Sequence, residues 1–167
     1  MKNLISTLLI AGALTGVTTS ASAESSLKAG LFGISIGIGN DSDMIGGRYM
    51  LSNDLAVGGS VGFGINGGDA DGTDISFGIG ARKYIKQATV SPFIGGRFGY
   101  TSTNGGDNKG FLFAAEFGAE AFLAKNFSVE GSIAFGYSSD EQCQQGGCGK
   151  VNRLGTQTFG ASLNYYF

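Results

Sequence analysis

The sequence predicts an all-β protein, an eight-stranded antiparallel up-and-down transmembrane β-barrel. Three observations lead to this fold class: a removable leader at the N-terminus, eight runs in which bulky apolar residues alternate with small or polar ones, and a composition that disfavours helices. The 167 residues include 31 Gly, 13 Phe and 6 Tyr. Gly costs about 1 kcal/mol per helix position relative to Ala, and aromatic residues at alternate positions are typical of strands. So many aromatic residues also argue against disorder as the explanation for the glycines.

Residues 1–23 have the pattern of a signal peptide. Lys2 supplies a positive start, residues 4–17 form a mostly apolar stretch, and the segment ends on the small residues Ala21, Ser22 and Ala23. A short membrane anchor is the alternative, but the apolar stretch falls short of the roughly 20 residues that span a bilayer as a helix. We expect cleavage after Ala23, which leaves residues 24–167 as a single β-barrel domain exported to the periplasm.

Eight runs of alternating character follow, at 28–39, 44–51, 55–65, 75–84, 90–100, 111–123, 127–137 and 156–167. In the third run, Leu55, Val57 and Val61 lie on one face. Small residues such as Gly58 and Ser60 lie on the other. A soluble β-sandwich also alternates, but its solvent face is rich in Lys, Glu and Thr. A second face of Gly, Ser and a few charges fits the tight interior of an eight-stranded barrel, whose apolar face is turned to lipid.

The connections between the runs predict the orientation of the barrel. Those at 52–54, 86–89 and 124–126 are short, whereas those near 40–43, 66–73, 102–109 and 139–153 are mostly longer. Short turns of bacterial barrels face the periplasm and long loops face the exterior, so both chain ends are expected on the periplasmic side. The outer loops are acidic, with Asp41, Asp43, Asp69, Asp71, Asp74, Asp107, Asp140 and Glu141. Residues 68–74 faintly resemble a calcium loop but lack its third acidic position and its closing Glu. A solvated loop is therefore expected there, with divalent-cation bridging to lipopolysaccharide phosphates as the alternative.

Six charged residues are expected in the lumen: Arg48, Arg82, Arg97, Glu116, Glu120 and Glu130. The turn after Leu123 places Glu120 opposite Glu130, where like charges destabilise a pair unless cations intervene. A charge in a low-dielectric interior persists only when it is paired, and an Arg can bridge two carboxylates. We therefore predict an ion-pair network of Arg48 and Arg82 with Glu120 and Glu130. Above this network we predict a second pair, Arg97 with Glu116. Permanent packing is the preferred role of these charges, and a gate or ion-selective constriction is the alternative.

Bulky side chains below these charges are expected to close the periplasmic mouth: Met50, Tyr84, Phe93, Phe122 and Tyr166. Above the charges, the lumen is expected to be lined by the small residues Gly33, Ser35, Gly37, Ser60, Gly62, Ser76, Gly78, Ser132 and Gly136. An eight-stranded barrel is only just wide enough for its own side chains. The sequence therefore predicts a closed vestibule that opens to the outside, and no free diffusion of solutes through the barrel.

Catalysis and cofactor binding find little support in the residue types. The chain has no His to act as a base, and Glu120 and Glu130 are expected beside arginines, without a cleft. Cys143 and Cys148 without His make a poor zinc site, so they are expected to form a disulfide that pins the last long loop. With a net charge of −2, the chain lacks the basic excess of a nucleic-acid-binding protein. We expect no enzymatic activity, no cofactor, no metal and no nucleic-acid partner.

The chain ends on Asn164, Tyr165, Tyr166 and Phe167. With this ending, the leader and the eight runs, residues 24–167 resemble the small eight-stranded outer-membrane proteins of the OmpA/OmpX type. Tyr165 and the terminal Phe167 are similar to the sorting signal that the barrel-assembly machinery reads. The resemblance implies the outer membrane of a Gram-negative bacterium, with lipopolysaccharide as a neighbour. The peptidoglycan-binding domain of the longer members is not expected, so no cell-wall anchoring is carried over.

Two functions remain open from the sequence. The first is a structural outer-membrane barrel whose acidic outer loops contact host surfaces, phage or neighbouring lipids, which includes a role in adhesion. The second is a narrow ion channel or porin-like pore. Loop sequences do not identify a ligand, because loops vary freely and their affinity depends on shape.

Overall fold

The computed structural model describes residues 27–39, 44–66, 72–103, 108–144 and 147–167. The predicted signal peptide and its cleavage site lie outside these residues. The strands are β1 (Phe32–Gly39), β2 (Met44–Met50), β3 (Leu55–Asn66), β4 (Gly72–Tyr84), β5 (Val90–Thr103), β6 (Asn108–Ala124), β7 (Phe127–Gln144) and β8 (Gly147–Tyr166). None of the described residues forms a helix long and apolar enough to cross a membrane.

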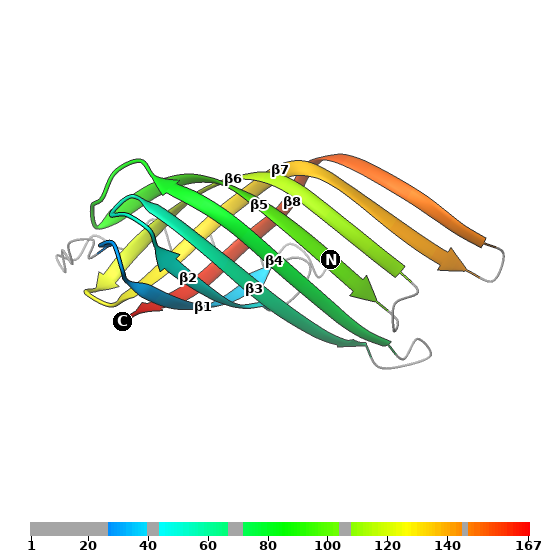
Figure 1. Ribbon diagram of the computed structural model, residues 1–167, viewed down its shortest axis with the longest axis horizontal. Helices are drawn as coiled ribbons and strands as arrows, with labels where there is room; N and C mark the ends of the chain where they lie inside the picture. The colour runs from blue at the N-terminus through cyan, green and yellow to red at the C-terminus, as the bar shows by residue number, and fades with distance from the viewer. Residues whose placement is uncertain (1–26, 40–43, 67–71, 104–107, 145–146) are drawn as a thin grey trace, which may run out of the picture.

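The eight strands form one closed barrel, as Figure 1 shows. Each strand pairs antiparallel with the next along the chain, and β1 pairs antiparallel with β8 from Gly33, opposite Tyr166, to Gly39, opposite Gly160. Closure matters because lipid leaves no water to satisfy the backbone groups of an open sheet edge. The predicted fold class, an all-β up-and-down barrel of eight strands, is confirmed.

The distribution of side chains is the reverse of that in a soluble protein. Large apolar residues are exposed on the outer face, among them Ile36, Phe63 and Ile79, each more than 60% exposed. Glu120, by contrast, is completely buried inside the barrel. The two-residue period of a strand produces this division, since successive side chains point to opposite faces of the sheet. The outer surface therefore suits a hydrocarbon environment, and the lumen carries the charge.

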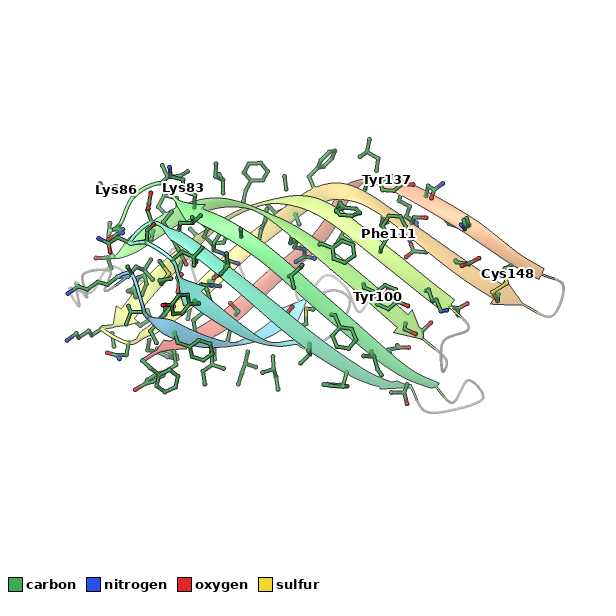
Figure 2. The ribbon with its side chains drawn as sticks, in the orientation of Figure 1. Lys83, Lys86, Tyr100, Phe111, Tyr137 and Cys148 are labelled. Atoms are coloured by element: carbon green, nitrogen blue, oxygen red, sulfur yellow. A yellow bond between two sulfur atoms is a disulfide. The ribbon has the colours of Figure 1, made fainter. Side chains whose placement is uncertain are left out.

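Aromatic residues lie on the outer face of the barrel, including near both of its ends. Near one end, Phe32 stacks on Phe167 with ring centroids 6.4 Å apart. Toward the other end, Phe111 lies 6.1 Å from Tyr137, in the region labelled in Figure 2. Aromatic residues also flank the apolar band of outer-membrane barrels at its two interfaces.

The short turns share one end of the barrel with both ends of the described chain. Figure 2 shows Lys83 and Lys86 at this end and Cys148 at the opposite end. In the β2–β3 turn, the Ser52 hydroxyl donates a hydrogen bond to Asp54 over 2.7 Å. This hydrogen bond lowers the pKa of the exposed Asp54 carboxyl. The short turns and both ends of the described chain therefore lie together at the end that was predicted to face the periplasm.

The predicted boundaries are wrong by four residues or more at two places in the chain. The segment 139–153, expected to be a loop, is a paired hairpin in which β7 continues to Gln144 and β8 begins at Gly147. Its polar, Gly-rich sequence hid the strands, because outside the membrane a strand need not carry an apolar face. The first strand begins at Phe32 and not at residue 28, since a turn with Gly30 at φ 89° precedes it.

Candidate functional site

The lumen contains a network of ion pairs built from strands on opposite sides of the barrel. Arg48 on β2 contacts Glu120 of β6 at 3.2 Å and Glu130 of β7 at 2.8 Å. Arg82 on β4 contacts Glu130 at 2.6 Å and Glu116 of β6 at 3.3 Å. Each arginine therefore bridges two carboxylates, as the planar guanidinium allows. The structure thus brings together the four charges that were predicted to form the network, and adds Glu116 to them.

Glu120 and Glu130 lie directly opposite each other in the β6–β7 register, as predicted. Two buried carboxylates on neighbouring strands would repel each other. However, Arg48 contacts both of them and Arg82 contacts Glu130. The positive charges of the arginines therefore compensate the repulsion between the two glutamates.

Glu120 accepts hydrogen bonds from several other side chains. The hydroxyls of Tyr84 and Tyr166 donate to it over 2.6 Å and 2.8 Å. Ser128 and Asn164 also donate to this carboxylate. With Arg48, five side chains from four strands converge on one buried carboxylate. Such saturation offsets the cost of taking an anion out of water.

The five side chains predicted to close the periplasmic mouth lie together. Met50, Tyr84, Phe93, Phe122 and Tyr166 are each at most 2% exposed and form one core cluster. The rings of Tyr84 and Phe93 meet edge to face with centroids 5.8 Å apart. This cluster, here called the plug, fills the lumen below the ion pairs.

Sequence reasoning missed several members of this arrangement. Leu27 and Ala56 also belong to the buried cluster, and the plug tyrosines were predicted only as bulk. The hydroxyls of Tyr84 and Tyr166 donate to Glu120. A tyrosine instead of a phenylalanine at an inward position is a sequence signal for such a role, because a buried Tyr usually finds a hydrogen-bond partner. The inward polar positions Ser128 and Asn164 carried the same signal.

The predicted pair between Arg97 and Glu116 is not formed. Glu116 contacts Arg82 instead, because β5 and β6 align Glu116 with Gly95 and align Arg97 with Ala114. Counting residues from the short turns predicts this pair only if β5 and β6 have their ends at the same height along the barrel. However, Val90, the first residue of β5, pairs with Ala121, so β6 extends past it to Ala124.

Gly95 explains why Arg82 reaches Glu116. Both residues flank Gly95 in the register, Arg82 on β4 and Glu116 on β6. A Cβ at Gly95 would lie 2.6 Å from the Ala81 carbonyl oxygen and 3.0 Å from the Arg82 Cβ. The missing side chain therefore leaves the space that Arg82 crosses. Arg82 also lies over the Phe93 ring, 4.1 Å from its centroid, so it connects the ion pairs to the plug.

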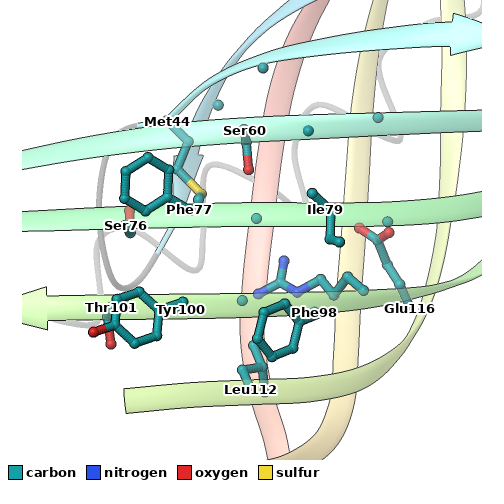
Figure 3. Close-up of a pocket in the computed structure, with 18 of the residues that line it drawn as sticks. Met44, Ser60, Ser76, Phe77, Ile79, Phe98, Tyr100, Thr101, Leu112 and Glu116 are labelled. Carbon is teal, nitrogen blue, oxygen red and sulfur yellow. The ribbon is translucent and has the colours of Figure 1, made fainter. Parts of the chain in front are cut away.

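A cavity of about 520 Å³ lies above the ion pairs. Of the small residues predicted to line a vestibule, Ser35, Gly37, Ser60, Ser76 and Gly78 line it. Figure 3 shows Ser60, Ser76, Met44 and Glu116 around this space. Gly33 lies lower, where a Cβ would approach the Tyr166 ring at 2.8 Å, and Gly62, Ser132 and Gly136 are not part of the lining.

Cys143 and Cys148 form a disulfide across β7 and β8, where they are partners in the register. The Cys143 amide also donates to the side chain of Asn108 over 2.9 Å. The bridge thus closes the outer hairpin near its tip, and the hairpin is tied to β6.

The two residues of the predicted assembly signal, Tyr165 and Phe167, point outward. They are 48% and 61% exposed, and their rings meet edge to face at 5.0 Å. The side chains that would present such a signal are therefore accessible from the membrane side of the β1–β8 seam.

An apolar outer belt, aromatic girdles and a polar lumen in a closed antiparallel sheet define an eight-stranded transmembrane β-barrel. Its fold is that of the small outer-membrane barrels. The chain is similar to the N-terminal β-barrel domain of Pseudomonas aeruginosa OprF, with a TM-score of 0.51 and 15% identity over 83% of this chain and 98% of that one. It is also similar to the outer membrane protein AlkL, with a TM-score of 0.53 and 11% identity over 90% of this chain and 94% of that one. No protein-family model matches the sequence, nor does any curated protein.

Proposed function

We propose that this chain is an exported, integral protein of a Gram-negative outer membrane that acts as a structural barrel with a sealed lumen. The observation that carries the proposal is the combination of plug and ion pairs. Five side chains that are at most 2% exposed fill the lumen at the end with the short turns, and the two arginines above them link β2 and β4 to β6 and β7. A solute would have to displace both layers to pass.

The proposal includes the absence of catalysis. The carboxylates that resemble an acid–base pair are already engaged, Glu130 by two arginines and Glu120 by five hydrogen-bond donors. A general acid or base must reach a substrate proton directly or through one water. Glu120 is completely buried, which argues against such a role.

The proposed surface role belongs to the outer hairpins. β7 and β8 extend well beyond the shorter β1 and β2, as Figure 1 shows. Asp140 and Glu141 on this hairpin are acidic, while most of the other acidic loop residues lie outside the described part of the chain. We propose that this end contacts lipopolysaccharide, with divalent cations between the carboxylates and lipid phosphates, or a host or phage surface. The exposed Tyr165 and Phe167 fit recognition by the barrel-assembly machinery.

Recordings from planar bilayers test the sealed lumen. The purified barrel is expected to give no stable unitary conductance above the level of bare lipid. Glu130→Gln is also expected to stay near background, because the plug remains below the altered ion pairs. A stable conductance of the unaltered protein would favour the alternative, a narrow ion channel. A large gain only in Glu130→Gln would show that the network is a gate.

A further inference from the structure

The cavity above the ion pairs has the size and lining of a binding site for a small molecule. Its volume of about 520 Å³ lies within the range of about 300–1,000 Å³ that is typical of ligand pockets. Arg82 and Glu116, which form an ion pair, are part of its lining. Because the plug closes the lumen below, the cavity is a blind cup and not a passage.

Hydroxyl groups line the wall of this cup beside glycines. A Cβ at Gly46 would lie 2.6 Å from the Ser35 hydroxyl oxygen, and a Cβ at Gly78 would lie 2.6 Å from the Ser60 hydroxyl oxygen. Each serine therefore occupies space that a neighbouring side chain would otherwise fill. Hydroxyls both donate and accept hydrogen bonds, so this wall suits a ligand that carries hydroxyls of its own.

Arg97 supplies a positive charge to the cup. It lines the cavity, yet within the described residues it has no ion-pair or hydrogen-bond partner. Glu116, the carboxylate that was predicted to pair with Arg97, contacts Arg82 instead. A guanidinium that is partly withdrawn from water is stabilised by an anion that accepts its paired N–H donors.

The acids around Arg97 restrict the charge of that anion. Asp74 and Asp140 also line the cavity, and Asp140 contacts Arg153 at 3.5 Å. With Glu116 on the floor, these carboxylates disfavour a ligand with several negative charges. A single carboxylate, planar and matched to the guanidinium fork, meets the least repulsion.

We propose that the cup binds a small hydroxylated monocarboxylate of the sugar-acid class, with its carboxylate on Arg97 and its hydroxyls toward Ser35 and Ser60. The ligand enters from the outer side, because the plug closes the other. This site is separate from the surface role proposed above and does not depend on conduction through the barrel.

Titration of the folded barrel in detergent micelles, followed by NMR of the backbone amides, tests the site. The probe is glucuronate, and glucose is the matched uncharged sugar. Saturable shifts are expected at cup glycines such as Gly78 and Gly99, with glucose binding at least about tenfold more weakly. Arg97→Gln is expected to weaken glucuronate binding by about tenfold or more. Lys86→Gln, which removes the same charge from the periplasmic turn, is expected to leave it within about twofold.

Two further arms complete the experiment. Arg97→Lys keeps the positive charge but lacks the paired donors of the guanidinium, so an intermediate affinity for glucuronate is expected. If Arg97→Gln does not fold into micelles, the affinity of Arg97→Lys is compared with that of the unaltered protein instead. An alkyl glucuronide presents the same acid on a lipid tail, and binding of this compound without binding of free glucuronate would overturn the assignment to a free solute. Equal affinity of glucuronate for the unaltered protein and Arg97→Gln, or no saturable shift in the cup, would overturn the proposal itself.

Discussion

Arg48 joins Glu120 and Glu130, two carboxylates that face each other across β6 and β7, at 3.2 Å and 2.8 Å. The like charges are thus part of one cross-barrel unit. Because Glu120 also accepts bonds from Tyr84 and Tyr166, the same unit ties the charges to the plug.

Glu130→Gln is expected to lower the free energy of unfolding by about 3 kcal/mol or more, because it leaves two mostly buried guanidiniums short of a carboxylate. Urea unfolding in lipid vesicles measures the change. Lys83→Gln is the control, since Lys83 and Asp54 form an exposed pair at 3.7 Å whose loss should cost less than about 1 kcal/mol. Equal stability of the two variants would contradict the structural role of the network.

Tyr166→Phe is expected to cost about 1–2 kcal/mol, because it removes a hydroxyl that donates to Glu120 and accepts from Arg48, each over 2.8 Å. The ring that packs against Phe122 is kept. Tyr165→Phe is the matched control on the adjacent, outward-facing position and should leave stability nearly unchanged. The same unfolding assay measures both variants, and a loss in Tyr166→Phe no larger than that in Tyr165→Phe would show that Tyr166 acts only as bulk.

Gly95→Ala is expected to destabilise the barrel by about 1–3 kcal/mol, since the new Cβ would meet the Ala81 carbonyl oxygen at 2.6 Å. It should also disturb the contact between Arg82 and Glu116 that crosses this position. Gly131→Ala is the control, because a Cβ there has no atom within 4 Å. Amide NMR shifts on β4 and β6 report the local effect, which should be absent in the control.

Reduction of the Cys143–Cys148 disulfide, or replacement of both cysteines by Ser, is expected to increase protease cleavage within the β7–β8 hairpin. The barrel should stay intact, because the bridge joins the hairpin far from the plug. Limited proteolysis followed by mass spectrometry locates the cuts. Cleavage within the barrel strands after reduction would show that the bridge stabilises the whole fold.

Much of the fold and part of the site follow from the two-residue period of the strands. That period separates lipid-facing from inward residues, so the plug and the pairing of Glu120 with Glu130 could be predicted. The partner of Glu116 could not be predicted, because it depends on how far β5 and β6 are offset, and a sequence does not record that offset. The long β7–β8 hairpin was hidden for another reason: outside the membrane its strands lose the apolar face that reveals the others.

The central claim is that apolar side chains face lipid around a closed, sealed barrel. Migration of the purified protein in a detergent gel, with and without boiling, tests it most directly. A closed barrel resists the detergent, so the unheated sample is expected to run as a separate band that disappears on boiling. A single band at the same position in both lanes, from protein that remains soluble without detergent, would contradict the account.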